Sequence, residues 1–446
     1  MAENQPNVVV FFTDQQRWDT TGIHGNPLDL TPNFDRFAKS GTHAYNSITC
    51  QPVCGPARSC LQTGLYATTT GCFRNGIPLP DDSKTLAHYF SESGYDTGYI
   101  GKWHLADTGS GAVPAEKRFG YQYWLASNVL EFTSDAYDMV MYDNDNQAVK
   151  LPGYRVDAQT DAAIRYIDQH QSNPFFLFLS YIEPHHQNHL DDYPPPDGYR
   201  EKYTSQWIPP DLAALVGSTH QHLAGYYGMV KRLDEAFGRL LDALKSLGLA
   251  DNTIVLFTSD HACHFKTRNS EYKRSCHDSS VRVPTALHGG CFVGGGEIRE
   301  MVSLIDLPPT LLDAAGIPVP EQMQGQSILP LIRGERSYWP SEALIQISES
   351  HTGRAIRSEK WKYSVRATGQ NSGKDRGANE YVEDFLYDLE VDPYELRNLV
   401  SAESHIEICH ILRQRLIDRM IESGESAPEI QAATKENSGQ RQISIR

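Results

Sequence analysis

The sequence predicts an α/β protein in which a central sheet carries helices on both faces. Short apolar runs rich in Val, Ile and Phe alternate with amphipathic segments at helical spacing, as in sheets covered by helices. The 446 residues, 39% of them hydrophobic, provide a sizeable core. No apolar run approaches the roughly 20 residues that a membrane-spanning helix needs, so we expect no membrane partner.

The first strand is expected at 7–13, a continuous apolar run of the kind buried on both faces of a sheet. Thr31 and Pro32 then supply an N-cap and a first-turn proline for a helix that Gly41 ends. Further strands are expected at 97–101, 175–180, 253–258 and 281–286. Further helices are expected at 83–93, 158–170 and 223–244.

Polar residues follow two of these strands. Asp14 comes directly after the first strand, and Asp260 comes just after the run at 253–258. The carboxyl ends of strands border the binding crevice in open α/β sheets, so we expect both carboxylates to lie there.

After Leu331 the pattern changes to shorter alternating segments at 343–347, 354–363 and 385–389, followed by an amphipathic helix at about 403–423. We therefore expect three regions: an α/β domain with the candidate site over 1–340, a C-terminal subdomain with a small antiparallel sheet and a helix over 341–425, and a disordered polar tail over 426–446.

Charge and cysteine content exclude several classes of protein. A net charge of −16 argues against a nucleic-acid partner, because such proteins usually present a basic face. Eight cysteines in 446 residues are too few for a disulfide scaffold.

The first residues have no basic segment of the signal-peptide type, so we expect a cytoplasmic protein, or a periplasmic or secreted one if a leader has been removed.

Cys54 is expected to begin a helix, where free N–H groups lower a thiol pKa and favour an anionic substrate. Arg58 lies one turn further along the same face. A cysteine at a helix start is, taken alone, more often a small buried hydrophobe. The surrounding motifs decide between these interpretations.

Cys54-Gly-Pro-Ala-Arg58, followed by Leu61-Gln-Thr-Gly64, resembles the Cys-x-Pro-x-Arg signature of type I, formylglycine-dependent sulfatases. Further motifs occur in the family's order: Asp14-Gln15, Gly101-Lys102-Trp-His104, Pro184-His185, Ser259-Asp260-His261, Lys273 and the closing segment 386–399. The resemblance therefore covers nearly the whole chain. It implies an alkaline phosphatase-like fold with a large mixed, mostly parallel sheet sandwiched by helices.

The resemblance implies that a maturation enzyme oxidises Cys54 to formylglycine. One hydroxyl of the hydrated aldehyde, ionised by a metal, would attack sulfur, and the other would let the residue collapse to the aldehyde and release sulfate. Arg58 would orient the hydrate and offset its charge.

The metal ligands implied by the family are Asp14, Gln15, Asp260, His261 and the modified residue 54. The amide and the imidazole leave two carboxylates and loosen the preference for a hard, oxygen-seeking cation. We expect Ca²⁺, with Mg²⁺ and Mn²⁺ as alternatives.

Two lysines and two histidines complete the implied catalytic set. Lys102 and Lys273 would hold the sulfate oxygens. His104 and His185 are candidates for protonating the leaving oxygen, and His185 is the preferred general acid.

A polar, His- and Arg-rich rim suits a sulfated carbohydrate, as a small molecule or an oligosaccharide, better than a bare aryl ring. The candidate substrate contacts are Arg74, Asn75, His186, His189, His264 and His277. The family usually has glycine where this chain has Ala262, and often tyrosine where it has His277, so the substrate is less well determined than the chemistry.

The sequence thus predicts a sulfatase that hydrolyses a sulfate monoester with S–O scission. Relatives with the same signature hydrolyse phosphonate monoesters or phosphodiesters, and this remains the alternative activity. A non-catalytic metal binder with a structural Cys54 is a third interpretation. Cys263 and Cys276 lack the spacing of a zinc site, so a separate zinc centre is disfavoured.

Overall fold

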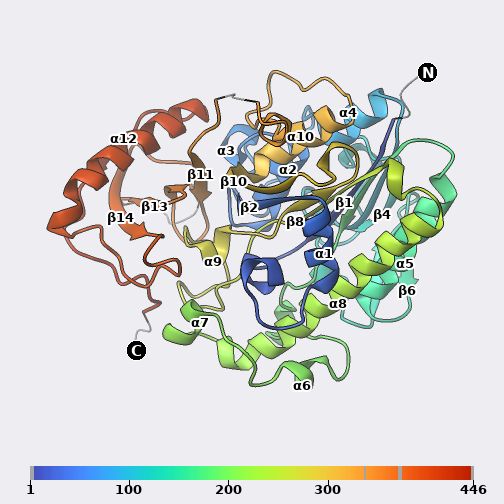
Figure 1. Ribbon diagram of the computed structural model, residues 1–446, viewed down its shortest axis with the longest axis horizontal. Helices are drawn as coiled ribbons and strands as arrows, with labels where there is room; N and C mark the ends of the chain where they lie inside the picture. The colour runs from blue at the N-terminus through green and yellow to red at the C-terminus, as the bar shows by residue number, and fades with distance from the viewer. Residues whose placement is uncertain (1–4, 336–337, 370–373, 443–446) are drawn as a thin grey trace.

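A computed structural model describes residues 5–335, 338–369 and 374–442. Two sheets organise this part of the chain, as Figure 1 shows. The larger sheet has ten strands in the order β10-β2-β9-β8-β1-β7-β3-β4-β5-β6, and the smaller has five in the order β11 to β15. The expected α/β class with a smaller C-terminal sheet is confirmed.

The larger sheet is parallel through its centre, from β8 to β4, and antiparallel beyond β4. Its strands are β1 (Asn7–Thr13), β2 (Thr42–Ile48), β3 (Asp96–Lys102), β4 (Tyr123–Ser127), β5 (Met139–Tyr142), β6 (Ala148–Leu151), β7 (Phe175–Ser180), β8 (Thr253–Ser259), β9 (Ala286–His288) and β10 (Gly296–Ser303). β1, β7 and β8 are buried along their whole length, which explains their unbroken apolar sequences.

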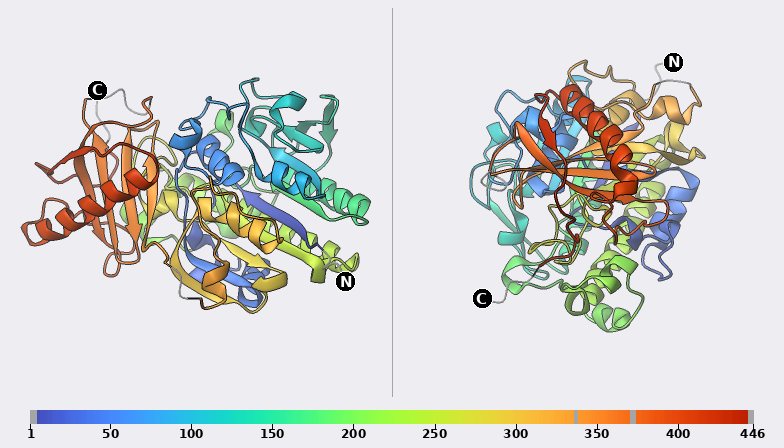
Figure 2. Two further views of the ribbon diagram at one scale, coloured as in Figure 1. Left: turned by 90° about the horizontal axis from the view of Figure 1, so that it is seen from above. Right: turned by 90° about the vertical axis from the view of Figure 1, so that its left-hand side faces the viewer.

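Helices cover both faces of this sheet (Figures 1 and 2). One face carries α1 (Pro32–Ser40), α5 (Arg155–His170) and α8 (Thr219–Ser246). The other carries α2 (Cys54–Thr63), α3 (Ala67–Thr70), α4 (Leu86–Glu92) and α10 (Leu307–Ala314). Shorter helices are α6 (Tyr199–Tyr203), α7 (Pro210–Ala214), α9 (Asp278–Val281) and α11 (Leu329–Ile332). None of the described helices is both long and apolar enough to cross a bilayer.

The smaller sheet lies at one end of the molecule and packs against α12 (Ile406–Glu422), as both views in Figure 2 show. Its strands are β11 (Glu342–Ile347), β12 (Gly353–Ser358), β13 (Trp361–Ala367), β14 (Glu380–Asp388) and β15 (Glu429–Gln431). Its first strand begins close to the expected boundary at 341, which stays a prediction as a domain limit.

Two expectations for individual segments are wrong. The segment 281–286 is not a strand, because α9 occupies its start and Pro284, which has no N–H to donate, precedes the short strand β9. The segment 426–442 is not disordered. It adds β15 beside β14, and Asn437 donates to Asp384 Oδ1 at 2.7 Å. Residues 443–446 lie outside the described part.

Candidate active site and metal centre

The two strands that end at the candidate site are neighbours in the sheet. β1 and β8 run parallel with Thr13 opposite Ser259, so Asp14 and Asp260 emerge side by side at the carboxyl edge. The Asp260 side chain accepts hydrogen bonds from the backbone N–H groups of Gln15 and His261, at 3.0 and 2.8 Å. These bonds hold together the loops that follow β1 and β8. Both carboxylates lie at the carboxyl edge of the sheet, as expected from the sequence.

Cys54 is the first residue of α2, and its side chain is 1% exposed. Its Sγ lies 3.2 Å from His261 Nε2 and 3.6 Å from Asp14 Oδ1. The start of α2 is fixed from outside, because Gly55 N–H donates to Asn75 Oδ1 at 2.9 Å. The helix thus delivers its N-terminal residue to the carboxyl edge of the sheet.

The site has the donor set of a cation site. One ligand atom from each of Asp14, Cys54, Asp260 and His261 lies within 4.8 Å of the others. His261 Nδ1 lies 3.0 Å from Ala262 O and donates to it, which leaves Nε2 with the lone pair that binds a metal.

Two buried oxygens also suit a bound cation. Within the described part of the chain, Gln15 Oε1 and Asp260 Oδ2 are buried without a hydrogen-bond partner. The Gln15 amide nitrogen is used, since it donates to Tyr193 OH at 3.0 Å and to Cys263 Sγ at 3.2 Å. The residues expected as ligands therefore suit a divalent metal.

Three cationic side chains surround this cluster. Arg58 donates to Asp14 Oδ2 at 2.9 Å, and to Lys102 O and Ser180 Oγ at 2.9 and 2.5 Å. Lys102 Nζ lies 2.8 Å from Asp14 Oδ2. Lys273 Nζ lies 2.7 Å from Cys54 Sγ. An anionic group bound at Cys54 would meet two ammonium groups and a guanidinium.

The pKa values reflect this crowding of charge. Burial opposes ionisation of Asp14, but Lys102 and Arg58 hold its pKa well below the usual range. Burial and the charge of Asp14 raise the pKa of Asp260 to about 7. A cation between the two carboxylates would remove this penalty. Burial and Asp14 also oppose the Cys54 thiolate, yet the neighbouring cations lower its pKa to about 6.

The two candidate proton donors lie in different surroundings. His185 Nδ1 donates to His186 O at 2.6 Å, and its Nε2 lies 3.3 Å from Lys273 Nζ. Burial and the charge of Lys273 keep the pKa of His185 well below its ordinary value. Burial and Lys102 lower the pKa of His104 to about 3, and its buried Nδ1 has no partner among the described residues.

The six expected substrate contacts do not form one group. Asn75 lies beside Gly55, and Arg74 donates to the Asn75 carbonyl at 3.3 Å. His186 packs between His185 and Tyr272, with ring centroids 4.7 and 4.2 Å away.

Within the described part of the chain, the other three expected contacts are not hydrogen-bonded to Cys54 or to the candidate metal ligands. His264 is fully buried, with Nε2 3.0 Å from Lys273 O, so it supports the backbone of the segment 264–277 that carries Lys273, here called the lysine loop. His189 is 55% exposed and pairs with Asp135 at 3.2 Å. His277 lies 3.0 Å from Tyr387 OH in the C-terminal sheet.

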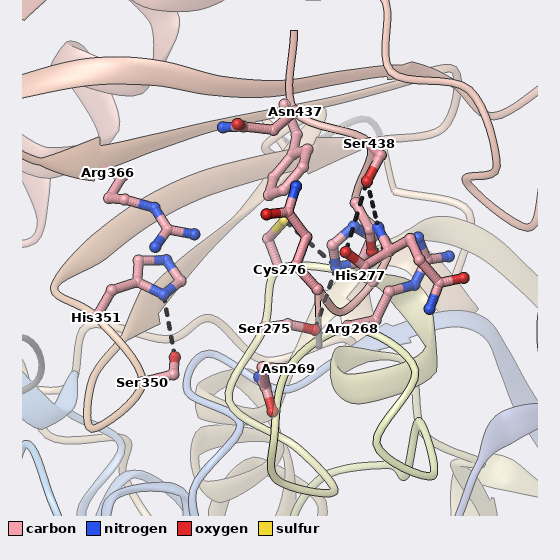
Figure 3. A pocket seen from close by; sticks show the side chains of 14 residues that line it. Arg268, Asn269, Ser275, Cys276, His277, Ser350, His351, Arg366, Asn437 and Ser438 are labelled. Carbon is pink, nitrogen blue, oxygen red and sulfur yellow. Dashed lines mark hydrogen bonds between the residues drawn. The ribbon is translucent and has the colours of Figure 1, made fainter. Parts of the chain in front are cut away.

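His277 lines a cavity of about 480 Å³ between the lysine loop and the C-terminal sheet. Figure 3 shows Ser275, Cys276 and His277 on one side of it and His351 and Arg366 on another. Cys276 lines this cavity, whereas Cys263 contacts Gln15 and Tyr193, so the two cysteines do not form a common metal site.

Several residues at the site carry no sequence signal. Glu131 neutralises Lys102 at 2.8 Å, and Ser180 accepts from Arg58. Tyr193 holds the Gln15 amide. No motif or periodicity marks these positions, because each reaches the site only through the tertiary fold.

The profile of the family described as Sulfatase matches residues 6–317, and the profile described as N-sulphoglucosamine sulphohydrolase, C-terminal, matches residues 271–422. The ulvan-active sulfatase of Formosa agariphila is 30% identical over 94% of this chain and 82% of its own length. The N-acetylglucosamine-6-O-sulfatase of Bacteroides thetaiotaomicron is 24% identical over 95% of this chain and 88% of its own.

A solved structure shares the fold. It holds a protein in complex with its substrate D-glucosamine-2-N,6-O-disulfate. The TM-score is 0.77 at 21% identity, over 94% of this chain and 98% of that one.

Proposed function

Because the chain belongs to the sulfatase family, we propose that it hydrolyses a sulfate monoester of a carbohydrate, using a formylglycine made from Cys54 and a divalent metal. The chain is a sulfuric ester hydrolase. What the proposal adds is the substrate class, the modified residue, the metal and the role of each side chain.

The observation that carries the proposal is the environment of Cys54. A buried thiol at a helix start lies 2.7 Å from the Lys273 ammonium and 3.2 Å from His261, in a cluster with two carboxylates. A structural cysteine would gain nothing from such neighbours, whereas a reacting group needs them.

Each side chain of the site has a separate role in the proposed reaction. Asp14, Gln15, Asp260 and His261 would hold the metal, which would offset the charge of the two carboxylates and lower the pKa of an oxygen ligand. Hydrated formylglycine would supply a hydroxyl oxygen as the nucleophile in place of the Cys54 sulfur. Lys273, next to residue 54, binds the sulfate oxygens and stabilises the negative charge that grows on them. Arg58 and Lys102 hold Asp14 in its ionised form.

The leaving alcohol oxygen needs a proton, and we assign its delivery to His185. Its Nδ1 proton is committed to His186 O, so Nε2 can donate only when the ring is protonated. A bound anionic ester places negative charge beside this nitrogen and raises its pKa. His104 is the second candidate.

We assign the metal as Ca²⁺, with Mg²⁺ and Mn²⁺ as alternatives. The Gln15 amide oxygen and the two carboxylates supply the hard oxygens that Ca²⁺ takes, and the imidazole relaxes that preference. Titration of the metal-free protein with each cation, followed by thermal unfolding, tests this assignment.

A sulfated carbohydrate is the proposed substrate class. Two relatives that align over nearly the whole chain are named for ulvan and for N-acetylglucosamine 6-sulfate. Arg74 and Asn75, next to the start of α2, supply hydrogen-bonding groups that suit a hydroxylated ring. A formylglycine-generating enzyme is the proposed maturation partner.

The test is a panel assay at equal enzyme concentration. The panel contains N-acetylglucosamine 6-sulfate, D-glucosamine-2-N,6-O-disulfate, ulvan oligosaccharides, an aryl sulfate, a phosphodiester and a phosphonate monoester. We expect the highest kcat/KM on a sugar sulfate. Faster turnover of the phosphorus esters would contradict the proposal. A tryptic peptide lighter by about 18 Da at Cys54 verifies that the sample is mature.

A further inference from the structure

A closed ring of contacts surrounds the start of α2. Gly55 N–H donates to Asn75 Oδ1 at 2.9 Å, and Asn75 N–H donates to Glu349 Oε1 at 2.7 Å. The other oxygen of Glu349 pairs with Arg274 Nη2 at 2.5 Å. Arg274 directly follows Lys273, whose ammonium returns to Cys54 Sγ. The ring therefore joins the C-terminal sheet domain to the nucleophile.

Exposure differs sharply around this ring. Cys54 and Lys273 are 1% and 6% exposed. The side chains of Arg274 and Glu349 are 19% and 17% exposed. A sulfate group that reaches Cys54 leaves the alcohol part of the ester nearer to solvent, where this ion pair lies.

Both members of the pair have an unusual backbone. Arg274 has φ +70° and Glu349 has φ +67°, in the left-handed region that residues other than glycine rarely adopt. Such conformations cost free energy and persist mainly where the surrounding structure enforces them, often at ligand sites. Gln15 and His104, which belong to the candidate site, share this feature.

The pair also has unused hydrogen-bonding capacity. Arg274 directs Nη1 to Glu271 and Nη2 to Glu349, at 3.3 and 2.5 Å, and each of these nitrogens carries a second N–H that can donate. Glu349 uses one oxygen for Asn75 N–H and the other for Arg274, and each carboxylate oxygen can accept a further bond. An acceptor beside a donor matches two neighbouring hydroxyl groups on a sugar ring.

We propose that Arg274 and Glu349 determine specificity by binding neighbouring hydroxyl groups of the sugar that carries the sulfate. The inference rests on the proposed function and adds the residues that recognise the leaving group. Glu349 accepts a hydrogen bond from one hydroxyl, and Arg274 donates one to the next. Neither residue contacts the sulfur of the sulfate group or residue 54.

A purely structural role predicts a different result. If the pair only anchored the Lys273 loop, its loss would misplace the lysine and slow every sulfate ester equally. If the pair binds the sugar, its loss lowers kcat/KM only for substrates that have hydroxyl groups at that position. The ratio of kcat/KM for a sugar sulfate to that for 4-nitrophenyl sulfate, which has no sugar, separates the two roles.

The experiment measures this ratio for the mature full-length protein and for Glu349→Gln, with the sugar sulfate that the parent cleaves fastest in the panel above. We expect the ratio to fall at least about tenfold, through a higher KM, because a charged acceptor becomes a neutral one. Glu271→Gln is the matched control. Glu271 also pairs with Arg274, at 3.3 Å, but lies outside the ring, so we expect an unchanged ratio.

An unchanged ratio in Glu349→Gln, with the sugar sulfate still cleaved by the parent, would overturn the inference and leave the proposed function standing. A parent that cleaves 4-nitrophenyl sulfate and no sugar sulfate would overturn both. If Glu349→Gln does not fold, as thermal unfolding reports, Arg274→Lys replaces it. That variant keeps the charge but loses the forked donor, and the same fall in the ratio is expected.

Discussion

At the scale of single residues, Gln15 shows how the proposed metal site would depend on neighbours outside the proposed ligands. Its amide nitrogen donates to Tyr193 OH, which fixes which end of the amide is free. Partners of this kind orient a metal ligand and typically contribute tenfold to a hundredfold in metal affinity.

Removing this partner gives the first prediction. Tyr193→Phe keeps the ring and loses the hydroxyl, so we expect metal affinity to fall about tenfold. Isothermal titration of the metal-free protein with Ca²⁺ measures it. Tyr227→Phe, whose hydroxyl instead donates to Trp207 O, should bind the metal as the parent does. Equal affinity in the Tyr193→Phe variant would show that the Tyr193 hydroxyl does not orient the Gln15 oxygen for the metal, since Cys263 Sγ still accepts from the same nitrogen.

His43 gives the second prediction. Burial and the charge of Arg282 lower its pKa to about 4, against about 6.5 in an unfolded chain. The unfolded state therefore binds a proton first as the pH falls. The contribution of neutral His43 to the free energy of unfolding is fully present above pH 6.5. It falls by up to about 3 kcal/mol as the pH approaches 4. Urea unfolding across this range should show a smaller loss in His43→Asn; an identical pH dependence would contradict the account.

The four residues that could hold a metal, Cys54, Asp14, Asp260 and His261, were predictable from motifs because they stand in recognisable sequence surroundings, and the structure brings them into one cluster. Glu131 and Glu349 were not. Each is an ordinary carboxylate in the sequence, and only the packing of distant segments places it beside Lys102 or Asn75.

At the scale of elements, the strand β3, which ends at Lys102, depends on one glycine. Gly101 in β3 has φ +116°, and a Cβ there would lie 1.9 Å from the backbone oxygen of Ser180 in β7. Only glycine allows these two strands to approach this closely while β3 delivers Lys102 to the site.

Gly101→Ala should therefore cost at least about 3 kcal/mol of unfolding free energy, from the strained backbone and the clash together. Gly153→Ala is the matched control, with φ +93° but open space around its Cβ, and should cost about 1–2 kcal/mol. Urea unfolding compares them. Equal costs would mean that the clash with β7 relaxes freely.

Elements with strong local patterns were predictable, and those set by tertiary pairing were not. β1, β7 and β8 are unbroken apolar runs, and α1 begins at Pro32 and ends before Gly41 as expected. By contrast, β15 is only three residues long in a polar segment and exists because it pairs with β14.

At the scale of the whole molecule, a buried ion-pair network joins the two sheets. Asp278 in α9 contacts Lys362 in β13 at 2.5 Å and Arg357 in β12 at 3.2 Å. Lys362 also pairs with Glu395 at 2.6 Å. Burial opposes the charge of Asp278, but Arg357 and Lys362 hold its pKa well below the ordinary value.

Asp278→Asn leaves two buried cations without their shared partner. We expect a loss of about 3–5 kcal/mol in unfolding free energy. Glu390→Gln, which breaks an exposed pair with Lys360, should change nothing measurable in the same denaturant titration. A loss in Asp278→Asn no larger than in this control would mean that the network does not hold the sheets together.

The central claim is that residue 54 is the group that reacts with the sulfate ester. The most direct test is kcat for sulfate release by Cys54→Ala and by its parent, both produced with the maturation enzyme. Alanine keeps the helix start but can be neither oxidised nor nucleophilic, so we predict less than about one thousandth of the parent's rate. Release as fast as the parent's would contradict the account.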